Sequence, residues 1–431
     1  MTYAIMVLAV LIFFILIGLH IPFAIGLATF IYIFLIHGPD MFIVMPQIMF
    51  SSVNVFAFLA VPAFILVGNL MSKSGITDIL VNFVRKIIGF IPGGLAHMNI
   101  LASIFFAGIS GSALADAASL GPIEISMMTK GGYTKEFSGA VTAASAVIGP
   151  IIPPSIVMVI YALIAGNVSI GAMFVAGYIP GLLMGVMLMV LIAILSKIKR
   201  FPKDDRSSLK EILQVTKLAI IPLMLPVFII GSIVFGITTA TEAAIIGVVY
   251  ALVIGLFVLK TLKLRDLPEI LLESAKTTGI ASIMITMAKV LSWFLAEQRV
   301  VQTLSSVITA KINDKNVFLA LLLLIYILIG CILDNTSAMA LSVPILLPIS
   351  LAFGINPLQF GIITNLAMCI GLITPPVGQV LFIICRIADV SFEKLSIAVL
   401  PFLFVELLCL LMITFIPQLS LFLPQVLGFI R

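Results

Sequence analysis

A six-residue pattern, Gly-x-Ile-x-Pro-Pro, occurs twice in this chain, at residues 149–154 and at residues 371–376. The second copy begins 222 positions after the first, and an acidic residue, Asp116 or Asp334, lies among small polar residues upstream of each copy. Further matches at the same offset pair Pro122, Ile123, Gly139, Thr142 and Ile148 with Pro344, Ile345, Gly361, Thr364 and Ile370. We therefore predict two related halves, each with an apolar segment that is interrupted at the same place.

The composition indicates that most of the chain lies in a membrane. Hydrophobic residues make up 62% of the chain and charged residues 10%, whereas ordinary soluble domains carry about 25% charged residues. Several apolar runs approach or reach the roughly 20 residues that cross a bilayer as a helix, at residues 176–195, 220–237, 243–259 and 317–333. These runs lack the alternation of a barrel strand. We predict an all-α polytopic membrane protein, with a transport site near the midplane where the two halves are broken.

The charged residues orient the chain. The two basic segments at residues 197–206 and 260–265 are separated by two apolar spans, so both lie on one side, which the positive-inside rule makes cytoplasmic. Residues 1–18 have neither a basic start nor a cleavage site and are predicted to be a first membrane helix. Residues 76–91 place charges around helically spaced apolar residues, which is typical of an interfacial helix. Nucleic acid is not an expected partner, because the basic residues lie at helix ends.

We divide the chain into five parts: residues 1–91 with N-terminal helices and the interfacial helix, 92–166 with the first repeat core, 167–312 with connecting helices and basic loops, 313–390 with the second repeat core, and 391–431 with a C-terminal helix. The sequence holds no Gly-x-x-x-x-Gly-Lys-[Ser/Thr] phosphate-binding loop, so we expect energy from an ion gradient or from another subunit rather than from ATP hydrolysis by this chain.

In the first half, Gly108, Ser110, Ser112 and Asp116 lie where an apolar run becomes polar. Glycine permits non-helical backbone, and hydroxyls and loosened carbonyls can coordinate a hard cation or donate to an anion. A charged Asp116 inside the membrane is expected to face a cavity or a partner. The paired prolines stop a helix, so residues 149–155 are predicted to form an unwound joint. The alternative is that these small residues only permit close helix packing.

In the second half, Asp334, Asn335, Thr336 and Ser337 follow an apolar run, and Thr374 lies within the second copy of the pattern. These groups are rich in oxygen and include no clustered His or Cys. Such ligands suit Na⁺ rather than a transition metal. Proton coupling through either aspartate is the alternative.

Charged residues outside the repeats have less specific interpretations. Arg299 is the best candidate to clamp a substrate carboxylate with its guanidinium fork, and the alternative is an arginine that reaches to the membrane interface. Glu242 either belongs to the site or pairs with a basic residue. The remaining candidates are interpreted as structural pairs or interface residues: Lys289, Arg386 with Asp389, and Glu406. The four cysteines have no metal or redox spacing and are interpreted as buried packing residues.

The motifs resemble those of the large membrane subunit of tripartite ATP-independent periplasmic (TRAP) transporters. The resemblance rests on Gly-Leu-Ala-His-Met-Asn at residues 94–99, Gly-Ser-Ala-Leu-Ala-Asp at residues 111–116 and the two Gly-x-Ile-x-Pro-Pro copies, and it spans nearly the full chain. It implies two inverted repeats, each with a re-entrant helical hairpin and a broken helix, in an elevator-type transporter of the bacterial inner membrane. A scaffold would hold still while a transport domain carries solute across with Na⁺.

The resemblance also implies partners and site residues. A periplasmic binding protein would deliver a small organic acid, and a separate small four-helix membrane subunit would complete the permease. Substrate would be bound by the hairpin tips and one joint: Ser110, Ser112, Asp116 and Ser155 in the first half, and Asp334, Asn335, Thr336 and Ser337 in the second. Arg299 would meet the substrate acid. Backbone oxygens near Gly108, Gly149, Gly330, Gly371 and Thr374 would hold Na⁺.

The resemblance is strongest to the sialic acid branch, with a C4-dicarboxylate as the second candidate solute. Another interpretation is a stand-alone Na⁺- or H⁺-coupled symporter or antiporter that needs no binding protein. A membrane scaffold or an intramembrane enzyme is disfavoured, because it leaves the paired breaks unexplained and the sequence offers no nucleophile and base set.

Overall fold

The computed structural model describes residues 2–36, 38–199 and 201–430, and over these residues the chain is helical with no β-strand. Eight of the described helical segments are long and apolar enough to cross a membrane. The prediction of an all-α polytopic membrane protein is therefore confirmed. Arg200 of the first basic segment, and the end residues Met1 and Arg431 of the predicted parts, lie outside the described residues.

Apolar side chains on the outside of the molecule indicate which surfaces meet lipid. On the long helix α10 (Ile170–Lys199), Leu182, Val186, Val190 and Ile194 are all exposed and recur every four residues. Residues at this spacing lie on one face of a helix. An exposed stripe of this kind is unfavourable in water and favourable against acyl chains.

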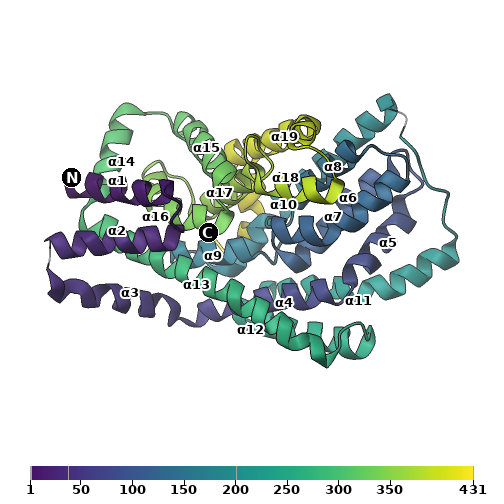
Figure 1. Ribbon diagram of the computed structural model, residues 1–431, viewed down its shortest axis with the longest axis horizontal. Coiled ribbons are helices and arrows are strands. Elements are labelled where there is room, and N and C mark those ends of the chain that lie inside the picture. The colour runs from purple at the N-terminus through teal and green to yellow at the C-terminus, as the bar shows by residue number, and fades with distance from the viewer. Residues whose placement is uncertain (1, 37, 200, 431) are drawn as a thin grey trace.

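The N-terminal part contains α1 (Thr2–Leu16), α2 (Ile21–Ile36), η1 (Pro39–Ile43), α3 (Val44–Val53), η2 (Phe56–Leu59), α4 (Ala60–Lys73) and α5 (Ile76–Ile88). In Figure 1, α1–α3 of the N-terminal part lie at the left, α4 lies below the middle and α5 lies in the right half. Helix α5 is amphipathic, since Ile76, Leu80 and Val84 are buried while Asp78 opens and Arg85 and Lys86 close the helix. It ends three residues before the predicted boundary at residue 91.

Each half contains a helical hairpin followed by a broken helix. The first consists of α6 (Gly94–Ser110) and α7 (Ala113–Lys130), then α8 (Lys135–Ala146) and α9 (Ile156–Ala165). The second consists of α15 (Lys315–Ile332) and α16 (Asn335–Ala352), then α17 (Pro357–Gly371) and α18 (Gln379–Ala388). The first copy of the Gly-x-Ile-x-Pro-Pro pattern lies inside the break between α8 and α9, and the second begins at the last residue of α17 and runs into the break. Both Pro-Pro bonds are cis.

The two halves are joined and flanked by longer helices. After α10 come α11 (Leu209–Val234), α12 (Ala240–Val253), the π-helical turn η3 (Ile254–Val258), η4 (Leu264–Asp266), α13 (Leu267–Glu297) and α14 (Val300–Lys311). The chain ends in α19 (Phe392–Phe415) and α20 (Gln418–Val426). Helices of the two halves pack against each other in the middle of the molecule, α9 against α16 and α18 against α7 and α8 (Figure 1).

Both basic segments lie beside α5. Arg85 donates to Asp204 in the first segment at 2.7 Å, and Lys86 pairs with Glu211 at 3.4 Å. At the other end of α5, the Thr261 hydroxyl donates to the Ser74 carbonyl at 2.7 Å. The two basic segments therefore lie on the same side of the chain, as the sequence predicted.

One ion pair differs from its sequence interpretation. Asp389 was expected to pair with Arg386, three residues away, but its carboxylate lies 2.9 Å from Lys135 at the start of α8. The hydrogen bond from the Lys135 ammonium and its charge hold the pKa of Asp389 below its usual range. The pair ties the end of the second broken helix to the beginning of the first.

Candidate functional site

The tip of the first hairpin is a Gly-Ser turn. Gly111 ends α6 in the left-handed conformation, with a φ of 62°, and Ser112 begins α7 as its N-cap. Glycine adopts this conformation without strain, and serine caps helices well. A Cβ atom at Gly111 would lie 2.7 Å from the carbonyl oxygen of Pro154. The tip therefore packs directly against the joint of the first broken helix.

Asp116 is the buried acid behind this tip. Its side chain is 1% exposed, and the Ser110 hydroxyl donates to its Oδ1 atom. Its Oδ2 atom has no hydrogen-bond partner within the described part of the chain. A side chain at Gly149 would collide with that same oxygen, so the unpartnered Oδ2 faces the backbone of the joint.

This arrangement fits a hard monovalent cation. A buried ionised carboxylate is costly unless a cation or hydrogen bonds compensate its charge. The Oδ2 atom of Asp116 is such an uncompensated oxygen. The Ser110 hydroxyl bonds the other oxygen of the same carboxylate, and Gly149 of the joint lies against Oδ2. Oxygen-only ligand sets suit Na⁺. The residues present therefore fit the cation that the sequence implied.

The joint of the first broken helix is held by two donors to one carbonyl. The Ser155 hydroxyl donates to the Pro150 carbonyl at 2.7 Å and also caps α9. Asn365, on α17 of the second half, donates to the same carbonyl at 2.7 Å. The two broken helices therefore meet at Pro150. Asn365 was not among the predicted site residues, since it matches Ala143 at the repeat offset and the duplication does not mark it.

The tip of the second hairpin is organised around Asp334. Its Oδ2 atom accepts from the backbone amides of Thr336 and Ser337, both at 3.1 Å. The Ser337 hydroxyl donates to its Oδ1 atom at 2.5 Å. Asp334 is thus the N-cap of α16, and both of its oxygens hold the tip in shape. The predicted set Asp334, Asn335, Thr336 and Ser337 is contiguous at this tip.

Two of the predicted cation-binding glycines also bring helices into contact. A Cβ atom at Gly330 would lie 2.7 Å from the Met368 carbonyl, and one at Gly371 would lie 2.6 Å from the Cα atom of Gly330. The hairpin helix α15 and the broken helix α17 therefore touch backbone to backbone. The Thr374 hydroxyl donates to the Ile370 carbonyl at 2.8 Å. Close packing explains these two glycines, and a contact between their carbonyls and Na⁺ stays a prediction.

A chain of polar contacts connects the second tip to the first joint. The Asn335 side-chain amide donates to the Cys369 sulfur at 2.9 Å, and the Cys369 thiol lies 3.5 Å from the Asn365 carbonyl oxygen. Asn365 then reaches Pro150. The first tip reaches the same joint through Gly111, and Gly108 lies beside the Pro153 carbonyl. The second tip through Asn335 and the first tip through Gly111 therefore both reach the joint around Pro150, beside which Asp116 is buried. A part for the other predicted tip residues in binding stays a prediction.

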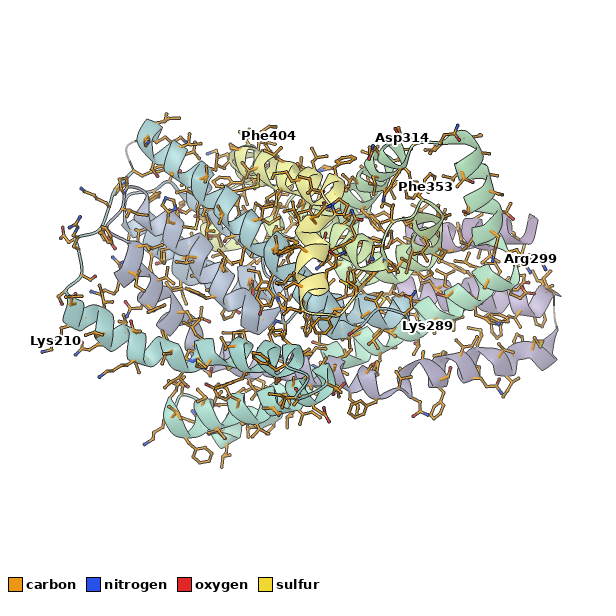
Figure 2. All side chains as sticks on the ribbon, turned by 180° about the vertical axis from the view of Figure 1, so that it is seen from behind. Lys210, Lys289, Arg299, Asp314, Phe353 and Phe404 are labelled. Atoms are coloured by element: carbon orange, nitrogen blue, oxygen red, sulfur yellow. The ribbon has the colours of Figure 1, made fainter. Side chains whose placement is uncertain are left out.

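Arg299 is not brought into this centre in the conformation described. It lies exposed at the connection between α13 and α14, in the left-handed conformation with a φ of 51°. Figure 2 shows it near one end of the molecule, away from Lys289 of α13. Its role toward a substrate acid stays a prediction.

Three other acidic residues have clear positions. Glu242, for which the sequence left two roles open, accepts from the Thr239 amide at 2.7 Å and closes the capping box of α12. Glu406 is fully buried in α19 rather than paired or at an interface, and neither of its carboxylate oxygens has a partner among the described residues. Glu124 on α7 is buried in the same way. Its position on α7, two helical turns after Asp116, is the sequence signal that could have identified it.

The cysteines match their interpretation closely. Cys331, Cys369 and Cys409 are buried, Cys385 is half-buried, and all four are free thiols. Cys369 has an additional role, since it lies inside the polar chain between the two halves.

Comparisons with known proteins agree with this architecture. Residues 8–419 match the family described as the tripartite ATP-independent periplasmic transporter, DctM component. The sialic acid TRAP transporter large permease protein SiaM of Vibrio cholerae is 37% identical over 379 residues, which cover 88% of each chain. The C4-dicarboxylate TRAP transporter large permease protein DctM of Pseudomonas aeruginosa is 36% identical over 394 residues, covering 91% of this chain and 92% of that protein.

A solved structure shares the fold at low sequence identity. The YdaH transporter of Alcanivorax borkumensis superposes with a TM-score of 0.63 at 14% identity, covering 88% of this chain and 87% of that one. At this identity the similarity concerns the fold alone.

Proposed function

The chain belongs to the DctM component family of tripartite ATP-independent periplasmic transporters, as a large permease, and from this premise we propose that it imports a small carboxylate solute driven by Na⁺. The observation that carries the proposal is that both hairpin tips reach the first joint, where the unpartnered Oδ2 atom of Asp116 is buried. Family membership also makes the chain a multi-pass protein of the bacterial inner membrane and a transport protein rather than an enzyme.

Ion coupling is proposed at the first tip. The Oδ2 atom of Asp116 and the oxygens near Gly108 and Gly149 would hold Na⁺, and oxygens near Gly330, Gly371 and Thr374 would do so in the second half. Binding of a cation at Asp116 would neutralise the charge of its carboxylate and stabilise the tip against the joint. A solute bound beside the tips would then sense whether the cation is present, which is the physical basis of coupled transport.

The proposed solute is an acid. Two large permeases similar to this chain are named for sialic acid and for C4-dicarboxylates, at 37% and 36% identity. We propose sialic acid first and a C4-dicarboxylate second. Ser112, Thr336 and Asn335 would donate to the solute from the two tips, Ser110, Ser155, Asp334 and Ser337 would keep the tips and the joint in shape, and Arg299 would meet the carboxylate after a movement of the tips.

The proposed mechanism is an elevator. The two hairpins and two broken helices would move as a transport domain against the remaining helices, while a small four-helix membrane subunit supports the immobile part. A periplasmic binding protein would deliver the solute. The tight backbone contact between α15 and α17 supports the idea that each hairpin moves together with its broken helix.

The decisive experiment is uptake of labelled sialic acid into proteoliposomes that contain this chain and the small subunit. The binding protein is added outside, and an inward Na⁺ gradient is switched on and off. We expect uptake only when both are present. Uptake by the chain alone would instead establish a stand-alone symporter, and uptake of succinate but not sialic acid would establish the second solute. An inward proton gradient that replaces Na⁺ at full rate would overturn the proposed ion.

A further inference from the structure

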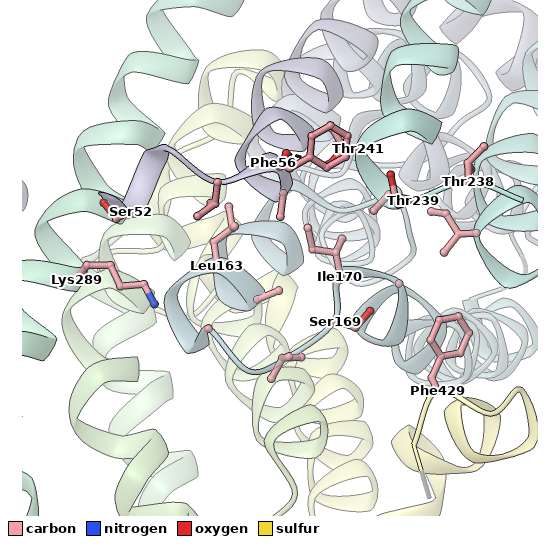
Figure 3. Close-up of a pocket in the computed structure, with 18 of the residues that line it drawn as sticks. Ser52, Phe56, Leu163, Ser169, Ile170, Thr238, Thr239, Thr241, Lys289 and Phe429 are labelled. Atoms are coloured by element: carbon pink, nitrogen blue, oxygen red, sulfur yellow. Dashed lines mark hydrogen bonds between the residues drawn. The ribbon is translucent and has the colours of Figure 1, made fainter. Parts of the chain in front are cut away.

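A cavity of about 820 Å³ lies apart from the hairpin tips. Its walls come from the end of α9, the start of α10, the segment between α3 and η2, and the connection between α11 and α12, with Lys289 of α13 on one side (Figure 3). Small-molecule sites are typically about 300–1,000 Å³, so this cavity has room for a solute of the size of a nine-carbon sugar acid.

The cavity lies on the side of the chain opposite to the basic segments. Helix α10 begins at the cavity with Ile170 and ends at Lys199 beside the first basic segment, 30 residues later. A helix of that length spans about 45 Å, which exceeds the thickness of the hydrocarbon core. Since the basic segments mark the cytoplasmic side, the cavity is nearer the periplasm, from which the solute arrives.

The lining of the cavity has one cation and no carboxylate among the described residues. Lys289 is half-buried, and its ammonium donates to the Ile164 carbonyl at 2.8 Å. A Cβ atom at Gly166 would lie 3.1 Å from the same nitrogen, so the glycine lets the ammonium approach the end of α9. An ammonium has three N–H donors, and no acidic partner for Lys289 occurs in the described part of the chain. Two donors therefore remain for a ligand.

Hydroxyl groups complete the polar wall. Ser169 accepts from the Ala172 amide at 3.4 Å, and its own hydroxyl hydrogen has no acceptor within the described residues, so it can donate to a ligand. The hydroxyls of Ser51 and Ser52 donate to the carbonyls of Ile48 and Met49. Their oxygens are left as acceptors. The wall thus offers hydrogen-bond donors for one anionic group of a ligand and hydrogen-bond acceptors for its hydroxyl groups.

We infer that this cavity is a second, periplasmic-side binding site for a hydroxylated monocarboxylic acid, with Lys289 as the ligand of its carboxylate and Ser169 as a supporting donor. The inference rests on the proposed function, because it takes from it that the solute is an acid. A single cation matches one carboxylate, whereas a C4-dicarboxylate would bring a second charge against a wall without a second cation. The site would hold the solute between its delivery and its transfer to the hairpin tips.

The test is a kinetic comparison of wild type with Lys289→Gln, Lys289→Arg and Lys276→Gln in proteoliposomes, with sialic acid as the probe. Lys276 lies on the same helix, is exposed and does not line the cavity. A charge-assisted hydrogen bond contributes about 1.5–3 kcal/mol, so Lys289→Gln should raise the KM for uptake by about tenfold to hundredfold with the maximal rate within about twofold. Lys289→Arg and Lys276→Gln should stay within about threefold of wild type.

Competition with the methyl ester of sialic acid separates ligand binding from a purely structural role of Lys289 at the end of α9. Wild type should prefer the acid over the ester, and Lys289→Gln should lose that preference. An equal preference for the acid over the ester in wild type and Lys289→Gln would overturn the inference. It would also be overturned if Lys289→Gln had an unchanged KM and had lost a phospholipid that co-purifies with wild type. A wild type that takes up no acid at all would instead reject the proposed function.

Discussion

At the scale of single residues, the two aspartates that lie upstream of the two Gly-x-Ile-x-Pro-Pro copies have different chemistry, and they are 218 rather than 222 positions apart. Asp334 uses both oxygens to cap α16 and to hold the Ser337 hydroxyl. Asp116 uses one oxygen for Ser110 and leaves the other unpartnered against Gly149. The duplication therefore marks both tips, but only the first tip contains an acid with an oxygen left for a cation.

Asp116→Asn should lower Na⁺-driven uptake by about a hundredfold. The substitution keeps the volume of the side chain and an acceptor for Ser110, but it removes the charge that faces the joint. Loss of one partner of a buried charge pair costs about 3 kcal/mol or more, which corresponds to about a hundredfold in binding. The measurement is the initial rate of uptake at several Na⁺ concentrations, with the amount of folded protein determined by size-exclusion chromatography.

Asp389→Asn is the matched control for Asp116→Asn. It removes an exposed carboxylate that pairs with Lys135 at 2.9 Å, and exposed pairs contribute little, so uptake should stay within about twofold of wild type. An Asp116→Asn protein with normal Na⁺ dependence would exclude Asp116 as a cation ligand.

At the scale of elements, the glycines of the second half position one helix against another. Gly330 on α15 and Gly371 at the end of α17 meet backbone to backbone, and the Gly378 amide donates to the Cys331 carbonyl at 3.4 Å. The second hairpin is thereby fixed to its own broken helix. The first hairpin is fixed in the same way by Gly111 against Pro154, so each hairpin and joint form one unit.

Gly371→Ala should destabilise the protein, which is the opposite of the usual effect of Gly→Ala in a helix. Alanine favours a helix over glycine by about 1 kcal/mol. At this position, however, the added methyl would lie 2.6 Å from the Cα atom of Gly330 and 2.8 Å from the amide nitrogen of Cys331. Overpacking of this kind costs about 1–3 kcal/mol. The measurement is the midpoint of thermal unfolding in detergent.

Gly279→Ala provides the comparison for Gly371→Ala. Gly279 lies on α13, and a Cβ atom there would meet no atom within 4 Å, so its midpoint should be unchanged or slightly raised. A midpoint for Gly371→Ala equal to that of Gly279→Ala would show that α15 and α17 are not in close contact.

At the scale of the whole molecule, polar contacts between the two halves surround a centre that neither half forms alone. Asn365 of the second half donates to Pro150 of the first, and Lys135 at the start of α8 pairs with Asp389 at the end of α18. The basic segments, both beside α5, mark one side of this assembly, and the connection between α11 and α12 lies on the other.

Labelling of single cysteines should confirm this sidedness. In a background with Cys385 replaced by Ser, Arg206→Cys should be protected from a membrane-impermeant maleimide added to intact spheroplasts, because positive loops stay cytoplasmic. Ile237→Cys, between α11 and α12 and 73% exposed, should be labelled. Both should be labelled after the membrane is permeabilised. Labelling of Arg206→Cys in intact spheroplasts would show that the chain has the opposite orientation. The cavity would then not lie on the periplasmic side.

Much of the fold could be predicted from the sequence, because its determinants are local. Membrane insertion follows from the composition and from apolar runs of spanning length. The ends of helices follow from residues that act on their immediate neighbours, such as Gly111 and Ser112 at the first tip. The predicted residues lie at the tips of the two hairpins, since a duplicated interruption marks matching points of two similar elements. Their part in binding stays a prediction.

The sequence by itself thus determined the class of the protein, the two hairpins with their broken helices, and the polar residues at each break. Only the tertiary structure decided that Asp116 faces Gly149, that Asn365 joins the halves at Pro150, that Asp389 pairs with Lys135, and that Lys289 lines a cavity. These contacts join residues 33 to 254 positions apart or depend on what surrounds a single side chain. Spacing along a chain fixes which face of a helix a residue occupies, but the packing of distant helices fixes what that face meets.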